Sequence, residues 1–172
     1  MTRILDDRSL DSLFRAARPC RSWLDKPVSD AIIEAVWELA KLPPTSTGAY
    51  PARIVFIRSL EAKQELLPAL AAEDRVAAAA APVNAILGYE GGTAPAALRD
   101  GSVQAGYLIL AARALGLDCA PLPLADPARV DRKFFADGRV KSSFVCNLGY
   151  GDSGTTEDGT TRPGFEQACR IV

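Results

Sequence analysis

The sequence predicts an α+β fold in which helices and strands follow one another without a dinucleotide-binding Rossmann arrangement. Short runs rich in Val, Ile and Leu alternate with segments whose apolar residues recur at helical spacing. No G-x-G-x-x-G motif joins a predicted strand to a predicted helix, and the chain has no Walker phosphate loop. This combination favours the α+β class, so any cofactor must be held by other means.

Size and charge indicate one domain that binds a small molecule. The 172 residues are 48% hydrophobic, enough for one core, so we expect a single domain over residues 1–172. A net charge of −1 leaves no basic stripe for a nucleic acid. The most apolar windows, 75–88 and 106–117, are too short or interrupted for a bilayer. We expect a cytoplasmic protein with neither a nucleic acid nor a membrane as partner.

Apolar spacing, caps and proline breaks predict the order of elements. Ser29 is a good N-cap, and Asp126 followed by Pro127 is another. Helices are predicted over 7–18, 29–43, 60–71, 98–117 and 126–135, and strands over 52–58, 82–89 and 143–150. A short segment over 119–124 joins the last two helices, and a core strand is one interpretation of its end. The helix over 98–117 is apolar nearly all round, so we expect a central buried helix. Residues 90–95 are predicted as a Gly-rich loop, and 165–172 as a short amphipathic end after a polar segment.

The chain contains no His, which excludes several enzyme classes. Ser-His-Asp and Cys-His hydrolases, His-ligated metals and His general bases are all ruled out. The four cysteines form no C-x-x-C pair, so neither a zinc site nor a thioredoxin-like motif is predicted, and we interpret them as reduced and mostly structural. If the protein is an enzyme, its chemistry is expected to reside on a cofactor.

Two segments carry candidate binding residues. After the Pro43-Pro44 pair, a hydroxyl-rich turn leads into a predicted strand, and its free hydroxyls and N–H groups can bind an anion or a ring edge. Arg18 and Arg21 stand three residues apart, where two guanidinium groups can converge on a phosphate. The alternatives are a turn that only connects two elements and two solvated surface arginines.

Several segments, in order along nearly the whole chain, resemble the flavin-dependent nitroreductases. The resemblance is closest to the branch that contains malonic semialdehyde reductase. It rests on the segments R-P-C-R-S-W (18–23), P-P-T-S-T-G-A-Y-P-A (43–52), G-L-D-C-A-P-L-P-L-A-D (116–126), K-S-S-F-V-C-N-L-G-Y-G-D (141–152) and R-P-G-F-E-Q-A-C (162–169).

The resemblance implies an FMN site and assigns residues to it. By position, Arg18 and Arg21 are assigned to the flavin phosphate and edge, and Arg162 of the tail is assigned as a third phosphate ligand. The remaining assignments, to the flavin ring and ribityl chain, are Thr45, Ser46, Gly48, Leu122, Pro123 and Leu124. Gly48 replaces the usual Asn, while Pro123 lacks an N–H and Leu124 replaces a Gly where the family's backbone donates to flavin N5.

The resemblance also implies an architecture and a reaction. The fold would be a mostly antiparallel sheet flanked by helices in an intertwined homodimer, with residues 151–172 packing on the partner subunit. NAD(P)H would reduce the flavin, and a small electron acceptor would then replace the nicotinamide in a ping-pong reaction. Malonic semialdehyde or a nitro or quinone compound is the expected acceptor. Related enzymes carry a longer insertion where this chain has only residues 90–98, which implies an open substrate face.

A protein of another class remains an alternative. The residues at Gly48, Pro123 and Leu124 and the short 90–98 loop also suit a degenerate nitroreductase-fold protein that binds flavin weakly or not at all and acts as a binding or sequestering module. A visible spectrum of the purified protein distinguishes the two, because bound flavin is yellow.

Overall fold

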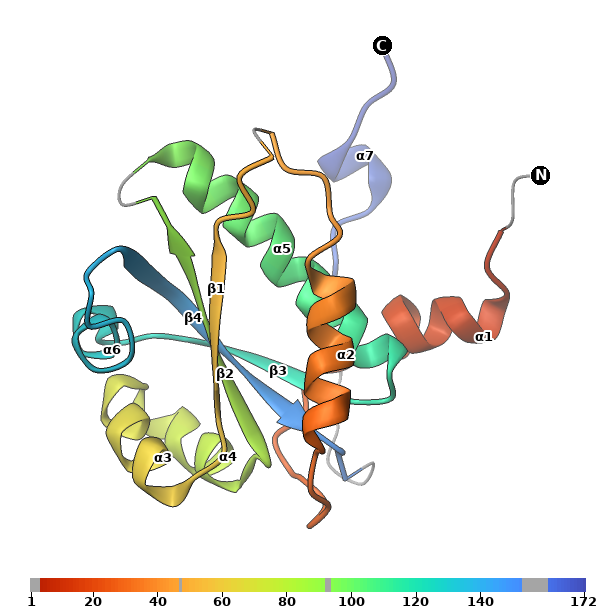
Figure 1. Ribbon diagram of the computed structural model, residues 1–172. Coiled ribbons are helices and arrows are strands. Elements are labelled where there is room, and N and C mark those ends of the chain that lie inside the picture. Colours follow the sequence, from red (N-terminus) through yellow and green to blue (C-terminus); the bar gives the residue numbers. More distant parts are fainter. Residues whose placement is uncertain (1–3, 47, 92–93, 153–160) are drawn as a thin grey trace.

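A four-stranded antiparallel sheet lies between two layers of helices (Figure 1). The computed structural model describes residues 4–46, 48–91, 94–152 and 161–172. The strands are β1 (Ala52–Ile57), β2 (Val83–Glu90), β3 (Asp118–Pro123) and β4 (Val140–Gly149). Their spatial order is β1-β2-β4-β3, and every neighbouring pair is antiparallel. The predicted α+β class and antiparallel sheet are confirmed.

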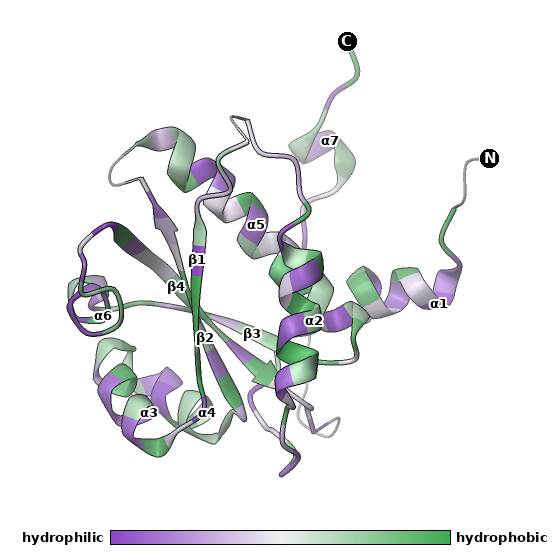
Figure 2. Cartoon of the chain, in the orientation of Figure 1, coloured by the Kyte–Doolittle hydropathy of each residue, from purple (hydrophilic) through white to green (hydrophobic). Residues whose placement is uncertain are grey.

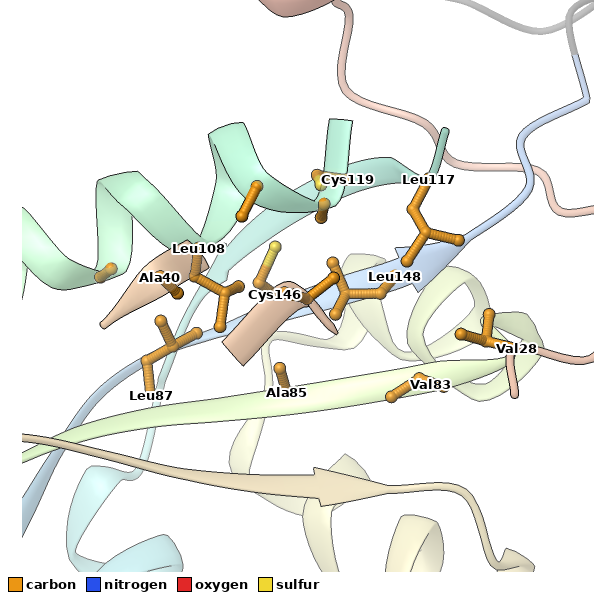
Figure 3. Close-up of a cluster of buried hydrophobic side chains, with 14 residues drawn as sticks. Val28, Ala40, Val83, Ala85, Leu87, Leu108, Leu117, Cys119, Cys146 and Leu148 are labelled. Atoms are coloured by element: carbon orange, nitrogen blue, oxygen red, sulfur yellow. The ribbon is translucent and has the colours of Figure 1, made fainter. Parts of the chain in front are cut away.

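Helices α2 (Asp30–Ala40) and α5 (Pro95–Ala114) cover one face of the sheet. Their buried side chains meet those of the central strands in one continuous apolar cluster, as Figure 3 shows. Cys119 of β3 and Cys146 of β4 point into this cluster, among Val83, Ala85, Leu87, Leu108 and Leu148. The cluster fixes α5 across the sheet, and α5 carries the candidate site described below.

Shorter helices cover the opposite face of the sheet. They are α3 (Leu60–Leu66), η2 (Leu67–Ala69), η3 (Ala72–Asp74), α4 (Arg75–Ala80) and α6 (Pro127–Phe134). Leu66, Leu70 and Val130 pack against Ile86 and Val145 of the central strands. Because β2 is covered on both faces, its first six residues are all buried, which explains why the strand is apolar without alternation.

Two elements differ from those predicted. Helix α4 was not predicted, because its run of alanines has no polar face and therefore no helical period. The first predicted helix, over 7–18, is instead α1 (Asp7–Leu10) followed by the π-helical turn η1 (Asp11–Arg15). The chain therefore leaves the helix before Arg18.

Helix α5 is not buried all round, contrary to our expectation. One side packs on the sheet and α2, but Leu98, Val103 and Tyr107 are 40–45% exposed. One helix presents only a stripe to a sheet, so the remaining apolar face needs another surface. Helix α1 with the following η1, and helix α7 (Phe165–Ala168), extend away from the sheet (Figure 1) and carry hydrophobic segments (Figure 2). Phe14 of η1 and Phe165 of α7 are exposed. None of the helices described here is long and apolar enough to cross a membrane.

We predict that Gly101→Ala separates α5 from β2 and lowers the free energy of unfolding by about 1 to 3 kcal/mol. A Cβ atom at Gly101 would lie 2.8 Å from the Cβ of Tyr89, closer than two packed carbons tolerate. Gly106→Ala on the same helix is the matched control, because a Cβ there meets nothing within 4 Å. Urea unfolding monitored by circular dichroism measures the free energy of unfolding of both variants. Equal stability of the two variants would contradict the close packing of α5 on the sheet.

Candidate functional site

The turn between α2 and β1 is held at both ends by side chains of α5. Asp100 Oδ2 accepts hydrogen bonds from the Ser46 backbone N–H at 3.0 Å and from the Ser46 hydroxyl at 2.8 Å. Gln104 Oε1 accepts from the Ala52 backbone N–H at 2.9 Å. Asp100 and Gln104 are four residues apart and so lie on one face of the helix. The hydroxyl-rich turn is therefore a positioned structure attached to the start of α5.

Arg99 completes this network at the surface. Its Nε donates to Asp100 Oδ1 at 3.1 Å, and its Nη2 donates to the Ser46 hydroxyl oxygen. The Asp100 side chain is 5% exposed, whereas that of Arg99 is 60% exposed. The Ser46 hydroxyl, followed by the Arg99 guanidinium, lowers the pKa of Asp100 below its ordinary value. Asp100 is consequently a fixed carboxylate and not a proton donor at neutral pH.

Two polar atoms at this end of α5 are buried and have no hydrogen-bond partner among the residues that the structure describes. They are Thr45 Oγ1 and Gln104 Nε2. Unpaired buried polar atoms cost free energy, and they are rare outside sites that a ligand or water completes. Gly48 adopts φ +68°, and a Cβ there would meet nothing within 4 Å, so the turn is open next to it. Thr47, between them, lies outside the described residues. The buried Thr45 hydroxyl fits the polar edge of a flavin.

The segment that contains Arg18 and Arg21 lies against the end of β4. The Leu24 N–H donates to Tyr150 O at 2.8 Å, and the Asp152 N–H donates to Ser22 O at 3.0 Å. Cys20 is 3% exposed and packs on Gly151. Burial raises the pKa of its thiol, which fits the structural role expected for the cysteine.

The Arg18 guanidinium uses only some of its N–H groups in hydrogen bonds to described residues. Its Nη1 donates to Arg15 O at 2.8 Å and to Ala17 O at 3.0 Å, and these bonds hold the side chain against the end of η1. A guanidinium has five N–H groups, and within the described part of the chain those of Nε and Nη2 have no acceptor, so they remain for an anion. Arg21 is exposed on the same segment. A hollow of about 270 Å³ lies next to Ala17, the residue before Arg18, and Arg113 and Asp118 also line it.

The other predicted residues lie elsewhere. Leu122 and Leu124 pack their side chains into the core on the opposite face of the sheet. Pro123 ends β3, which is an edge strand and tolerates a residue without an N–H. Arg162 is exposed on the tail that leads to α7. The side chains of Leu122 and Leu124 therefore pack on the core, whereas Pro123 is exposed.

Within one chain, the predicted residues do not form one site. Ser46 is attached near the start of α5, whereas the Arg18 segment contacts Gly151, which donates to Asp118 Oδ2 just beyond the end of α5. From Asp100 to Ala114 the helix rises by 14 residue steps, roughly 20 Å along its axis. The two groups of candidate residues, which we call half-sites, thus lie at opposite ends of one helix.

Sequence analysis missed Arg99, Asp100 and Gln104. The apolar residues of 98–117 dominated the pattern, so the helix was interpreted as core alone. The available signal was a carboxylate and an amide four residues apart on an otherwise apolar helix, since such residues are rarely buried without a partner.

Comparisons with known proteins identify the family of this chain. The family model described as "Nitroreductase family" matches residues 15–85. A "Putative NADH dehydrogenase/NAD(P)H nitroreductase" from Stenotrophomonas maltophilia (strain K279a) is 42% identical over all of both chains. A protein of the same name from Ralstonia nicotianae is 38% identical, with 98% of each chain covered. The chain belongs to the nitroreductase family.

Solved structures share the fold at low sequence identity. A "putative nitroreductase" from Exiguobacterium sibiricum 255-15, crystallised in complex with FMN, superimposes with a TM-score of 0.85 at 17% identity over all of both chains. The "putative nitroreductase" YdfN from Bacillus subtilis gives a TM-score of 0.85 at 14% identity, with 97% of this chain and 100% of that chain covered. These likenesses show the nitroreductase-like fold.

We predict that Asp100→Asn loosens the α2–β1 turn. The charged acceptor of both Ser46 bonds is lost, so the Ser46 amide should exchange its hydrogen faster in NMR. Because the folded-state pKa of Asp100 lies below 3.8, its contribution is complete above pH 3.8 and is lost as pH falls through the lowered pKa. Wild-type protein should therefore lose Ser46 protection in that acid range.

Asp137→Asn is the matched control for this prediction. Bonds from Arg139 also lower the pKa of Asp137, but Asp137 lies in the connection between α6 and β4. The control removes the same charge and should leave Ser46 exchange unchanged. Equal effects of the two substitutions would show that Asp100 does not hold the turn.

Proposed function

We propose that the protein is an FMN-dependent NAD(P)H oxidoreductase of the nitroreductase type. The observation that carries the proposal is the turn held by Asp100 and Gln104, with the Thr45 hydroxyl buried and unpaired beside it. Family membership, the names of the relatives and the FMN complex of the Exiguobacterium protein support it. When bound, FMN supplies the two-electron chemistry that a chain without His lacks.

The proposal requires a homodimer. The exposed apolar face of α5, the extended α7 and the exposed Ile171 and Val172 need a cover, and a second copy of the chain provides one. In a two-fold dimer the same surface meets itself in reverse, so the turn at the start of one α5 can face the Arg18 segment of the partner subunit. The tail from residue 151 onward would pack on that subunit. Two FMN sites per dimer follow.

Each predicted residue then has a role in holding the cofactor. Arg18, Arg21 and Arg162 would bind the phosphate, because guanidinium groups form charge-assisted bonds with it. The Thr45 hydroxyl would donate to the flavin, while the Ser46 hydroxyl, whose hydrogen is already given to Asp100, can only accept. Gly48 leaves room for the ring. At 122–124 the backbone would contact the flavin, although Pro123 cannot donate.

The described residues also bear on proton supply. Asp100 is the titratable acid in contact with the turn, and its lowered pKa keeps it ionised. We therefore propose that the proton for the reduced acceptor comes from water. The small electron acceptor, malonic semialdehyde or a nitro or quinone compound, would enter on the side of the α2–β1 turn. The reaction would follow a ping-pong mechanism and would take place in the cytoplasm.

Arg18→Ala and Arg162→Ala should each weaken FMN binding roughly tenfold or more, because each removes a charge-assisted donor from the phosphate. Titration of apoprotein with FMN, followed by flavin fluorescence, measures the affinity. Arg132→Ala on α6 is the control, since Arg132 is an exposed arginine that belongs to neither half-site.

Unchanged FMN affinity in both test variants would remove the phosphate assignment. A wild-type protein that is colourless when purified and ignores added FMN would instead favour the alternative, a flavin-free binding or sequestering module.

A further inference from the structure

Lys63 of α3 carries a buried ammonium group that no carboxylate of the described residues neutralises. The residue is 9% exposed, and its Nζ donates to Ala79 O at 3.1 Å and to Ala81 O, at the end of α4. An ammonium has three N–H groups, and the third has no acceptor in the part of the chain that the structure describes. Burial lowers the pKa of this amine below its ordinary value of 10.5, because water no longer solvates the charge. A buried cation of this kind is stabilised by an anion beside it.

The same side chain lines a cavity of about 570 Å³. The rest of the lining comes from segment 23–28, from Arg58 and from residues 80–82, where α4 leads into β2. Most of these residues are apolar, and a small number of polar groups accompany them, as is typical of small-molecule sites of this size. None of them is assigned to the flavin, so a ligand here does not depend on the proposed function.

Hydrogen bonds fix segment 23–28 at both of its ends. Trp23 Nε1 donates to Ala77 O of α4 at 3.2 Å, and Arg58 Nη1 donates to Val28 O at 3.3 Å. The two walls of the cavity are thereby attached to each other and to the end of β1. The cavity is formed before a ligand arrives, so binding need not order a flexible segment.

The charges at the cavity favour a ligand with a single negative charge. Arg58 forms an ion pair with Asp30, so this pair adds no net charge. Lys26 and Lys63 have no carboxylate partner among the described residues, and Asp25 supplies the one carboxylate of the lining. Two positive charges against one negative charge leave one positive charge for a ligand. A carboxylate matches that charge, whereas a phosphate monoester carries about −1.5 to −2 at neutral pH.

The apolar part of the lining favours a ligand with a flat ring. Trp23, Pro27 and Pro82 all line the cavity, and aromatic rings pack well against such side chains. We propose that this cavity binds an aromatic carboxylate. The carboxylate would accept the remaining N–H of Lys63, and the ring would lie against Trp23 and the two prolines. Lys26, which is exposed, would add attraction at the mouth of the cavity.

Titration of the ¹⁵N-labelled protein with benzoate tests the site by NMR. The chain has two tryptophans, Trp23 and Trp37, and Trp23→Phe assigns their indole N–H resonances. Benzoate should shift the Trp23 resonance in a saturable way and should leave that of Trp37, on α2, unchanged. Benzamide has nearly the same shape without the charge. It should bind at least about tenfold more weakly, because the charge-assisted hydrogen bond is lost.

Lysine variants test which groups hold the carboxylate. Lys63→Gln should weaken benzoate binding at least about tenfold, because it removes the buried ammonium group. That variant also loses the hydrogen bonds to the end of α4, so circular dichroism checks its fold. Lys26→Gln, at an exposed position, should weaken binding about threefold without that risk. Lys133→Gln on α6 is the matched control and should bind benzoate as the wild type does.

Three results would overturn the inference. The first is a wild type in which benzoate produces no saturable shift of the Trp23 resonance. The second is unchanged benzoate binding in Lys63→Gln and Lys26→Gln, or in Lys26→Gln alone where Lys63→Gln does not fold. The third is a change in flavin absorbance with the Trp23 resonance unshifted, because benzoate would then bind at the flavin and not in this cavity.

Discussion

Helix α5 is the constraint on which the rest of the arrangement depends. Its inner face is fixed on the sheet by an apolar cluster. Its first turns hold the α2–β1 turn through hydrogen bonds to Asp100 and Gln104. In the segment after the helix, Asp118 accepts a hydrogen bond from the Gly151 N–H. A rigid helix cannot bring its two ends together, so the half-sites stay about 20 Å apart within one chain. The uncovered apolar face of the same helix offers the surface on which a second chain would close that gap.

The polar network at the start of α5 reconciles stability with binding. Ser46 uses its N–H and hydroxyl hydrogen on Asp100, which orders the turn, while Thr45 leaves a buried hydroxyl without a partner. The Ser46–Asp100 bonds would lower the entropic cost of ordering the turn when a ligand binds. The Thr45 hydroxyl would remain as a donor for that ligand. Since Asp100 remains ionised, the network also supplies a fixed negative charge that orients Arg99.

Local signals predicted much of this fold. The Pro43-Pro44 pair, the Ser29 cap and the Asp126-Pro127 start marked boundaries, because caps and breakers act within a few residues. Alpha-helix α4 and the π-helical turn η1 lacked such signals. Of the candidate site, the turn with Thr45 and Ser46 was predictable from its composition. Its attachment to Asp100, 54 residues away, was not, because a long-range hydrogen bond leaves no periodic trace in a sequence.

Complementation between two defective chains tests the shared site most directly. One chain carries Arg18→Ala, the other carries Thr45→Val with Asp100→Asn, and the mixed dimer is purified by two different tags. A site built from both subunits places all substitutions in one site and leaves the other intact, so the mixed dimer should bind one FMN with wild-type affinity. A mixed dimer that binds FMN no better than either parent would contradict the account.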